Sequence, residues 1–356
     1  MGPTCVSLSP SEFQTRILSW FDLHGRKDLP WQKAISPYRV WVSEIMLQQT
    51  QVASVIGYYT RFMERFPKLE DLAQAEQDEV LQYWAGLGYY ARARNLHQTA
   101  GLILQQGGEF PQTPEALAAL PGIGRSTAGA ILSIACGQSQ AILDGNVKRV
   151  LSRFSAVEGW PGEPKVARQL WQISESLTPS ERTADYTQAM MDLGATLCTR
   201  SRPQCAVCPL VEHCQAYLQN RVGQFPQARP KKNQPVKQVF FLITVNDQQQ
   251  ILLMRRPSSG IWGGLWSLPE YADLQELQAD LQMNYTDFKV VKTLDAQRHS
   301  FSHFHLDYTP VIVRIQNPKN NVMEAGHRVW YKKQQWTDLG LPAPIKRLLQ
   351  LLETEV

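Results

Sequence analysis

The stretch CTRSRPQCAVCPLVEHC, residues 198–214, holds four of the six cysteines of this 356-residue chain. Cys198, Cys205, Cys208 and Cys214 are separated by six, two and five residues. Zinc sites with four cysteines usually pair two C-x-x-C motifs, and only Cys205 and Cys208 have that spacing here. Four thiolates in one short loop also suit a cubic iron–sulfur cluster. The spacing favours the iron–sulfur cluster over zinc, and either centre would constrain how this loop folds.

Such a centre needs reduced thiols, and the N-terminal sequence is compatible with a reducing compartment. The segment MGPTCVSLSPSEF has neither the basic nor the apolar region of a secretory signal. No stretch approaches the roughly 20 apolar residues that span a bilayer. We therefore expect a cytoplasmic protein without a membrane partner, nucleoid-associated if the source is bacterial. In that compartment clustered cysteines bind metal more often than they form disulfides.

The length and the changing pattern of residues predict two domains, since 356 residues exceed one comfortable core. Up to about residue 220 nearly every segment has helical periodicity. The predicted helices cover residues 9–24, 38–66, 71–84, 90–106, 114–120, 125–136, 146–155, 164–177 and 184–197.

The pattern then changes. Residues 222–237 contain three prolines, four basic residues and no acidic residue, which predicts an exposed linker. Strand-like runs follow, with a hairpin turn at Asn246 and Asp247 and a final helix at 343–353. The predicted strands cover residues 238–245, 251–256, 288–294, 304–315 and 328–333. We expect a mainly helical domain at 1–221, the linker at 222–237 and a small α/β domain at 238–356.

Net charge does not indicate a partner. The formal charge is +4, but residues 1–225 contain 20 Lys or Arg and 20 Asp or Glu. Contacts with a nucleic acid would have to come from local basic clusters, such as Lys148, Arg149 and Arg153, or Arg92 and Arg94. Taken alone, these clusters are more typical of a solvated helix face.

A glycine turn offers a second candidate site. The stretch LPGIGRSTAGAIL, residues 120–132, places Gly122 and Gly124 between two predicted helices. Backbone N–H groups at the start of the second helix can donate to a phosphate, and glycine lets a backbone approach its ligand closely. An ordinary helix–turn–helix connection would contain the same glycines, so this motif is ambiguous alone.

Several motifs together resemble one family. The glycine hairpin, the aspartate in ILDGNVKRV (142–150) and the six–two–five cysteine spacing resemble the helix-hairpin-helix iron–sulfur DNA glycosylases. Four further stretches narrow the resemblance to adenine DNA glycosylases of the MutY type: RKDLPW (26–31), WVSEIMLQQTQV (41–52), GLGYYARARNLH (86–97) and QAMMDLGA (188–195). The resemblance covers essentially the whole chain, including a C-terminal domain similar to the Nudix fold.

The resemblance implies both a fold and a reaction. The fold is a mainly α catalytic region of two helical subdomains with the cysteine loop 198–214, followed by a small α/β Nudix-like domain. The reaction is base excision repair, in which the N-glycosidic bond of adenine mispaired with 8-oxoguanine or guanine is hydrolysed and an abasic site remains. One [4Fe-4S] cluster, double-stranded DNA containing these mispairs and a monomeric state are implied as well.

Hydrolysis of an N-glycosidic bond needs an acid for the leaving group and a carboxylate for the developing sugar cation. On a helix, Glu44 shares a face with Val40, Trp41 and Leu47, and this apolar setting favours a protonated carboxyl near neutral pH. Asp144 precedes a Gly-Asn pair and a helix, where an aspartate is more often an N-cap. The resemblance instead implies that Asp144 stabilises or briefly bonds the sugar.

Position 126 separates two reaction types within the family that the chain resembles. Members that also cut the strand have a lysine there, whose amine forms a Schiff base with the sugar. Ser126 has no amine, so we predict a monofunctional enzyme. Lys148, one turn beyond Asp144, is the nearest spare amine and could support weak side activity.

The remaining site residues are implied by the resemblance alone. DNA contacts fall on Gln49 and Tyr89, which would fill the gap beside the opposite base, on Gly122, Gly124 and Ser126 of the hairpin, and on Arg200 and Arg202 facing phosphate. Lys27, Trp31, Tyr186 and Gln188 would line the adenine pocket, and Phe301, Ser302 and His303 would recognise 8-oxoguanine.

Three other functions remain to be weighed. A bifunctional glycosylase and lyase acting on oxidised pyrimidines is opposed by Ser126 and the extra domain. A non-catalytic mismatch sensor is opposed by the presence of both Glu44 and Asp144. Nudix hydrolase activity would need a glutamate-rich metal-binding stretch at 278–283, where this chain reads QADLQM.

Overall fold

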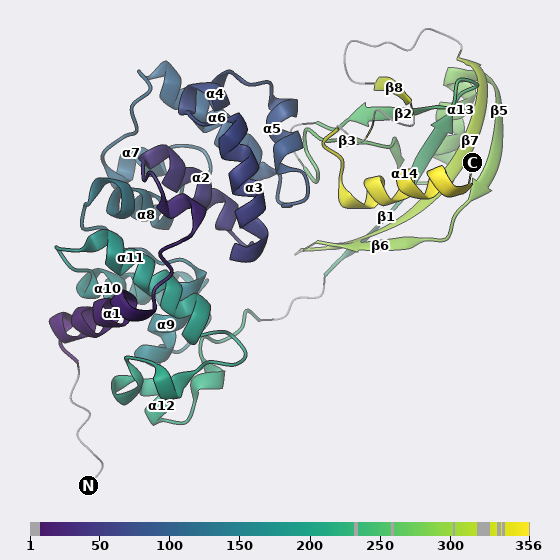
Figure 1. Ribbon diagram of the computed structural model, residues 1–356. Coiled ribbons are helices and arrows are strands. Elements are labelled where there is room, and N and C mark those ends of the chain that lie inside the picture. Colours follow the sequence, from purple (N-terminus) through teal and green to yellow (C-terminus); the bar gives the residue numbers. More distant parts are fainter. Residues whose placement is uncertain are drawn as a thin grey trace. The chain divides into compact units, whose positions relative to one another are not determined.

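The computed structural model describes residues 8–230, 234–257, 260–301, 303–318, 328–332, 336 and 339–355. The chain forms two compact units, residues 1–74 with 95–231 and residues 75–94 with 232–356. The first unit is helical and the second is built on a sheet (Figure 1). The predicted fold class, a mainly α region followed by a small α/β domain, is confirmed. Within the described residues, no helix is long and apolar enough to cross a membrane.

The helices that belong wholly or largely to the first unit are α1 Pro10–His24, α2 Pro37–Leu47, α3 Val52–Arg65, α4 Leu69–Gln74, α6 Ala91–Gln105, α7 Pro114–Ala118, α8 Arg125–Cys136, α9 Gly145–Phe154, α10 Pro164–Leu177, α11 Thr183–Asp192 and α12 Gln215–Leu218. Short helical turns lie at Pro30–Gln32, Leu193–Leu197, Cys205–Val207, Val211–His213 and Val222–Gln224.

Helix α1 shows how local sequence fixes an element of this unit. The Ser9 hydroxyl oxygen accepts from the Glu12 N–H at 3.3 Å, and the Glu12 carboxylate accepts from the Ser9 N–H at 3.0 Å, which completes a capping box. Phe13 and Ile17 are fully buried and pack in one core with residues of α9, α10 and α11. This core holds α9 in place.

One helix prediction is wrong in a way that affects the site. Residues 38–66 do not form one helix, because α2 ends at Leu47 and α3 begins at Val52. Gln49 between them has φ +57°, in the left-handed region that a right-handed helix excludes. Similarly, the helix predicted at 71–84 divides into α4 and α5, and the one predicted at 184–197 ends in the π-helical turn Leu193–Leu197.

The second unit contains one mixed sheet. Its strands run in the order β3-β2-β1-β7-β5, with β4 paired to β1, β6 to β7 and β8 to β2. Strands β1 and β7 are parallel and the other pairs are antiparallel. The elements are α5 Gln77–Trp84, β1 Val236–Val245, β2 Gln250–Arg255, β3 Trp266–Ser267, β4 Glu270–Tyr271, α13 Leu274–Asn284, β5 Tyr285–Thr293, β6 Gln297–Ser300, β7 His305–Pro318, β8 Arg328–Lys332 and α14 Ala343–Glu355.

Alternating side chains of β1 cover the sheet on both faces. Phe241 and Ile243 pack in the core that includes α14, whereas Leu242 packs in the core that includes α13. The hairpin predicted at residues 246–247 is confirmed, because Val245 pairs with Ile251 across it. Helix α13 and the short strands β3, β4 and β6 were not predicted.

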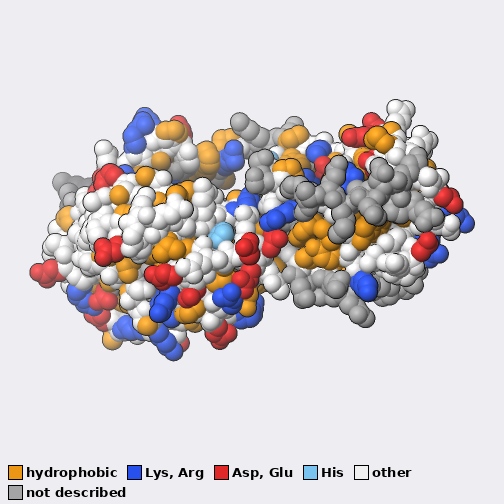
Figure 2. Space-filling model, turned by 90° about the horizontal axis from the view of Figure 1, so that it is seen from above, with side chains coloured by type: hydrophobic (Ala, Val, Ile, Leu, Met, Phe, Trp, Pro, Cys, Tyr) orange, Lys and Arg blue, Asp and Glu red, His pale blue; other side chains and the backbone are white. Residues whose placement is uncertain are grey.

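Charges of both signs share the surface. On the face shown in Figure 2, Lys and Arg side chains lie interspersed with Asp and Glu side chains. This mixture agrees with the equal numbers of basic and acidic residues counted over residues 1–225.

Two glycines in helices provide a matched test of the packing of the first unit. A Cβ at Gly129 of α8 would lie 2.5 Å from the Ala141 carbonyl oxygen, whereas a Cβ at Gly101 of α6 meets open space. We expect Gly129→Ala to destabilise the protein by about 1–3 kcal/mol through overpacking. Gly101→Ala should stabilise it by about 0.5–1 kcal/mol through helix propensity. Urea unfolding checks both, and equal effects of the two substitutions would contradict this packing.

Candidate active site

A cavity of about 840 Å³ in the first unit brings together elements that are distant in sequence. Its walls come from the α2–α3 turn, the starts of α8 and α9, the end of α11 and the loop before α2. The predicted site residues that line it are Trp31, Glu44, Gln49, Ser126, Asp144, Gln188 and Arg200. Both predicted catalytic carboxylates therefore face one space.

Asp144 is the N-cap of α9. Its side chain accepts from the Val147 N–H at 2.8 Å, so the capping interpretation of the sequence applies. Burial raises the pKa of Asp144, and the backbone N–H groups of Val147 and Asn146 act in the opposite direction. The cap fixes the carboxylate at the cavity wall, so the capping role and a role in chemistry are compatible.

Glu44 is the more strongly perturbed acid. It lies on α2, whose residues Val40 and Trp41 are buried. Burial, and secondarily the negative charge of Asp144, raise the pKa of Glu44 to about 8. At neutral pH this carboxyl retains its proton for most of the time. It can therefore donate a proton to a ligand in the cavity, as a general acid must.

Ser126 lies in the first turn of α8. Its hydroxyl oxygen accepts from the Leu143 N–H at 2.9 Å, which ties the start of α8 to the residue before Asp144. The hydroxyl is thus held beside the candidate catalytic aspartate. Among the described residues, the lining of this cavity includes Arg149 of α9 but not Lys148.

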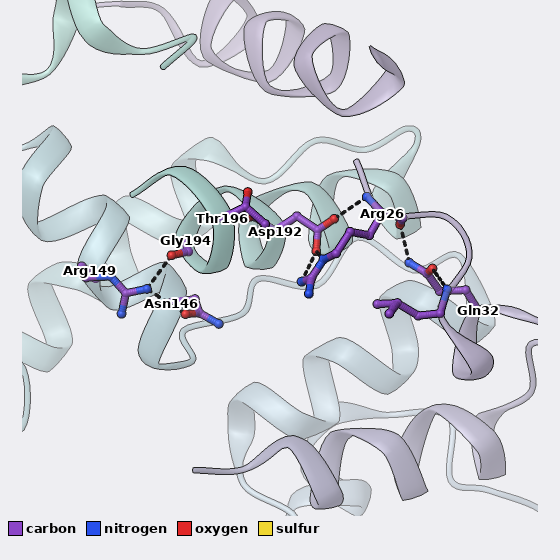
Figure 3. A network of polar contacts seen from close by, with 8 residues as sticks. Arg26, Gln32, Asn146, Arg149, Asp192, Gly194 and Thr196 are labelled. Atoms are coloured by element: carbon purple, nitrogen blue, oxygen red, sulfur yellow. Dashed lines mark hydrogen bonds and ion pairs between the residues drawn. The ribbon is translucent and has the colours of Figure 1, made fainter. Parts of the chain in front are cut away.

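An ion pair that was not predicted from the sequence stabilises one wall of the 840 Å³ cavity. The Asp192 side chain is 2% exposed and accepts from the Arg26 backbone N–H at 2.7 Å and from Arg26 Nε at 2.9 Å (Figure 3). A buried carboxylate needs such partners. The pair joins the RKDLPW segment, with Trp31, to the end of α11. The one available signal was a charged residue inside the apolar stretch QAMMDLGA.

Arg149 joins the start of α9 to the segment that leads into the cysteine loop. Its guanidinium donates to Asn146 Oδ1 at 2.8 Å and to the Gly194 carbonyl at 2.6 Å (Figure 3). It also donates to the Cys198 carbonyl at 2.7 Å. A Cβ at Gly194 would lie 2.6 Å from Asn146 Cβ, so only glycine allows this approach. These hydrogen bonds of Arg149 therefore hold α9, the helix capped by Asp144, against residues 194–198.

The four residues predicted for the adenine pocket divide between two cavities and the core. Trp31 and Gln188 line the large cavity and also a second cavity of about 200 Å³. Lys27 lines only the second cavity. Tyr186 is 4% exposed and packs in the core with α1 and α9 residues, outside the linings of both cavities. The structure thus brings Trp31 and Gln188, rather than Lys27 or Tyr186, to the space that Glu44 faces.

The glycine hairpin has the geometry that backbone donation requires. Gly122 has φ +78°, and a Cβ there would lie 2.8 Å from Asn95 Cβ. Gly124 is the N-cap of α8, and within the described residues no side chain caps this helix. Its first-turn N–H groups can therefore donate to an outside acceptor such as phosphate.

The two predicted wedge residues share an unusual backbone. Gln49 has φ +57° and Tyr89 has φ +49°, conformations that are uncommon for residues of their size. Both are exposed, Tyr89 by 53%. They lie in different units, so each has to be judged separately. Strain held at an exposed side chain motivates a functional hypothesis for both positions.

The predicted lesion-reading segment is only partly described. Phe301 stacks on Phe304 with ring centroids 4.6 Å apart, and the exposed His303 ring lies 4.8 Å from Phe304. Ser302 lies outside the described residues. In the same unit, the stretch 278–283 lies on α13, where Asp280 accepts from the Tyr271 hydroxyl at 2.7 Å.

The four cysteines of the loop surround one small space. Cys198, Cys205, Cys208 and Cys214 all line a cavity of about 30 Å³, together with Arg153. Burial raises the pKa of the Cys208 thiol to about 12, so thiolates here need positive charge nearby. Among the described residues, no group of three or more His, Cys, Asp or Glu is arranged to hold a metal ion.

The buried Arg153 provides part of that charge. It donates from Nη1 to Cys198 Sγ at 3.3 Å and to the Thr199 carbonyl at 2.7 Å, and from Nε to the Phe225 carbonyl at 2.9 Å. The four cysteines that line one small cavity beside a cation supply the number and kind of donor atoms that a cluster with four thiolate ligands uses. The donor set is compatible with such a cofactor.

Comparison with known proteins agrees with this fold and site. Residues 42–176 match the HhH-GPD superfamily of base excision DNA repair proteins, and residues 239–351 match the NUDIX domain. The structure of a thermostable thymine-DNA glycosylase superposes with a TM-score of 0.54 at 27% identity, covering 59% of this chain and 97% of that one. The fold and the cavity thus define a base excision DNA glycosylase.

Relatives over nearly the whole length narrow this class. The adenine DNA glycosylase of Buchnera aphidicola subsp. Acyrthosiphon pisum is 37% identical over 339 residues, which cover 95% of this chain and 97% of that protein. The adenine DNA glycosylase of Mus musculus is 34% identical, with 96% of this chain and 78% of that protein covered. The chain belongs to the adenine DNA glycosylase family. The predicted enzyme class is confirmed.

The raised pKa of Glu44 makes a prediction about stability that is independent of activity. Between about pH 4.5 and 8 the folded protein retains a proton that the unfolded chain releases, so stability falls as pH rises through this window. Glu44→Gln should remove this contribution, and its stabilising effect should grow from pH 5 to pH 8.5. Thermal unfolding of both proteins across this range measures the difference. A difference that does not change with pH would contradict the raised pKa.

Proposed function

We propose that the chain is a monofunctional glycosylase that excises adenine paired with 8-oxoguanine or guanine and leaves an abasic site. The observation that carries this proposal is that Glu44 and Asp144 face one cavity with unlike environments. In this assignment residues 1–221 catalyse, 222–237 link, and 238–356 recognise the lesion. The protein acts as a monomer on duplex DNA.

The chemistry follows from the protonation states of the two carboxyls. Glu44 gives its proton to a ring nitrogen of the adenine rotated into the cavity. The bond between adenine and the sugar then breaks, and its electron pair leaves with the base. Asp144, ionised and held by the N–H of Val147, stabilises the cationic sugar until water adds to it. The Glu44 carboxylate then takes up the proton that this water releases. Trp31 and Gln188 are the wall residues that contact the base.

The remaining predicted contacts hold the DNA. Gly122, Gly124 and Ser126 present backbone N–H groups to phosphate, and Arg200 at the cavity rim supplies charge. Gln49 of the first unit and Tyr89 of the second unit each insert between bases of the duplex. Phe301, Ser302 and His303 recognise 8-oxoguanine, and Lys27 and Tyr186 support the adenine pocket from behind its wall.

Glu44→Gln should lower the single-turnover rate of adenine release by about a hundredfold or more, because an amide has no proton to give at this step. Adenine release from a duplex with one 8-oxoguanine:adenine pair measures this rate. The matched control is Glu64→Gln, which changes an exposed glutamate of α3 and should leave the rate unchanged. The parent rate should also fall as pH rises through about 8. Release by Glu44→Gln at the parental rate would exclude Glu44 as the acid.

The same assay separates a monofunctional enzyme from a lyase. Because Ser126 has no amine, strand breaks should appear only after alkali treatment. Breaks without alkali that disappear in Lys148→Ala would show a Schiff base at Lys148 and overturn the monofunctional assignment.

We further propose that Cys198, Cys205, Cys208 and Cys214 hold one [4Fe-4S] cluster that keeps their loop in shape. The proposed role of the cluster is structural and not catalytic, since hydrolysis needs no electron transfer. The purified protein should contain about four iron ions per chain. Cys205→Ser should reduce the iron content and the melting temperature, whereas Cys136→Ser, at the end of α8, should change neither the iron content nor the visible spectrum. Full iron content in Cys205→Ser would contradict this ligand set.

A further inference from the structure

Residues 75–94 form one compact unit with residues 232–356, although the sequence places them among the helices. Asp78 of α5 pairs with Arg255 of β2 at 2.5 Å. Leu81 of α5 is buried. A Cβ atom at Gly264 would lie 3.7 Å from Leu81 Cδ1, and a Cβ atom at Gly340 would lie 3.5 Å from Leu81 Cβ, so both glycines lie close to this side chain. The exposed Tyr89 therefore belongs to the same unit as Phe301 and His303.

The loop of residues 85–90, which contains Tyr89, is stabilised by the buried Arg92. Arg92 donates from Nη2 to the Leu87 and Gly88 carbonyls at 3.3 Å and 3.2 Å, and Trp84 Nε1 donates to the Gly88 carbonyl at 3.1 Å. The guanidinium of Arg92 lies 5.6 Å from the centre of the Tyr89 ring. These contacts keep Tyr89 at its positive φ with its side chain in solvent.

Arg94 connects this loop to one turn of the sheet domain. Its backbone N–H donates to the Tyr90 carbonyl at 3.1 Å, and its Nη1 donates to the Gly263 carbonyl. The bond is partly buried, and burial lowers the pKa of Arg94. A movement of the 260–264 turn would therefore act directly on the segment that follows Tyr89.

The other side of the same turn touches the lesion-reading segment. Trp262, next to Gly263, has its ring centroid 5.5 Å from that of Phe301 and 5.6 Å from that of His299. Trp262 has φ +54°, a strained conformation for so large a residue. One strained turn thus contacts Phe301 through Trp262 and Arg94 through Gly263.

We propose that the 260–264 turn couples recognition of the opposite base at Phe301 to base extrusion at Tyr89, with Arg94 and Trp262 as positioning residues. This inference rests on the proposed roles of Phe301 and Tyr89. When 8-oxoguanine occupies the recognition segment, Phe301 fixes Trp262 and the turn, and Arg94 holds the Tyr89 loop in the inserted position. Opposite guanine, this constraint is weaker and the loop inserts less often.

The test measures extrusion separately from chemistry. The fluorescent base 2-aminopurine replaces adenine opposite 8-oxoguanine or guanine, and Glu44→Gln is present throughout to prevent excision. Rotation of 2-aminopurine out of the stack raises its fluorescence. We expect Arg94→Met to lower the extrusion equilibrium opposite 8-oxoguanine by about tenfold, within the range of measured coupling between sites, and opposite guanine by less than twofold. Combining Arg94→Met with Phe301→Ala should add little to either change alone.

The matched control is Arg298→Met, which breaks an ion pair with Asp307 between β6 and β7 of the same unit and should leave both duplexes unaffected. An equal loss on both duplexes in Arg94→Met would reveal a general structural or phosphate-binding role. No loss on either, or full additivity with Phe301→Ala, would overturn the proposal as well. If the Glu44→Gln reference itself extrudes 2-aminopurine equally opposite both bases, the proposed lesion preference fails instead.

Discussion

Two carboxyl groups that face one cavity are the constraint on which the site depends. Removal from water and, secondarily, the negative charge of Asp144 disfavour ionisation of Glu44, and the pKa of its carboxyl rises to about 8. Asp144 is also desolvated, but backbone N–H groups at the start of α9 favour its charged form. In the proposed mechanism Glu44 holds a proton at neutral pH while Asp144 is ionised. A site that holds one proton between two carboxyls can offer an acid and an anion together.

The surrounding structure maintains this arrangement through three arginines, of which Arg153 is buried and Arg26 and Arg149 are partly buried. Arg149 and Arg153, one turn apart on α9, donate to backbone and sulfur atoms of the cysteine loop, so the helix that Asp144 caps is fixed on its far side. Arg26 fixes the opposite wall through Asp192. The guanidinium groups of Arg149 and Arg153 each meet several acceptors, and that of Arg26 donates twice to one carboxylate oxygen of Asp192. A lysine ammonium would match such fixed geometry less well. In the proposed mechanism the cysteine loop therefore affects catalysis only through the position of α9.

The sequence predicted the parts of the site that have local signatures. Cysteine spacing, the glycine hairpin and the apolar neighbours of Glu44 are readable from short stretches, and the fold class followed from periodicity. The break at Gln49 was not predicted, because a four-residue turn hardly disturbs the apolar pattern of the two helices. The Arg26–Asp192 pair was not predicted either, since its partners are 166 residues apart. The association of residues 75–94 with the sheet domain depends on long-range packing around Leu81, which no local pattern reveals.

The most direct measurement is the pKa of the Glu44 carboxyl itself. Infrared difference spectra of the parent protein minus Glu44→Gln, recorded from pH 4 to pH 10, isolate the carbonyl stretch of this protonated side chain. The raised pKa of Glu44 predicts that the band persists at neutral pH and disappears near pH 8. Because the charge of Asp144 contributes to this pKa, Asp144→Asn should shift the loss of the band to lower pH. Loss of the band near pH 4.5, the ordinary pKa of a glutamate, with no effect of Asp144→Asn, would contradict the assignment of Glu44 as the protonated acid.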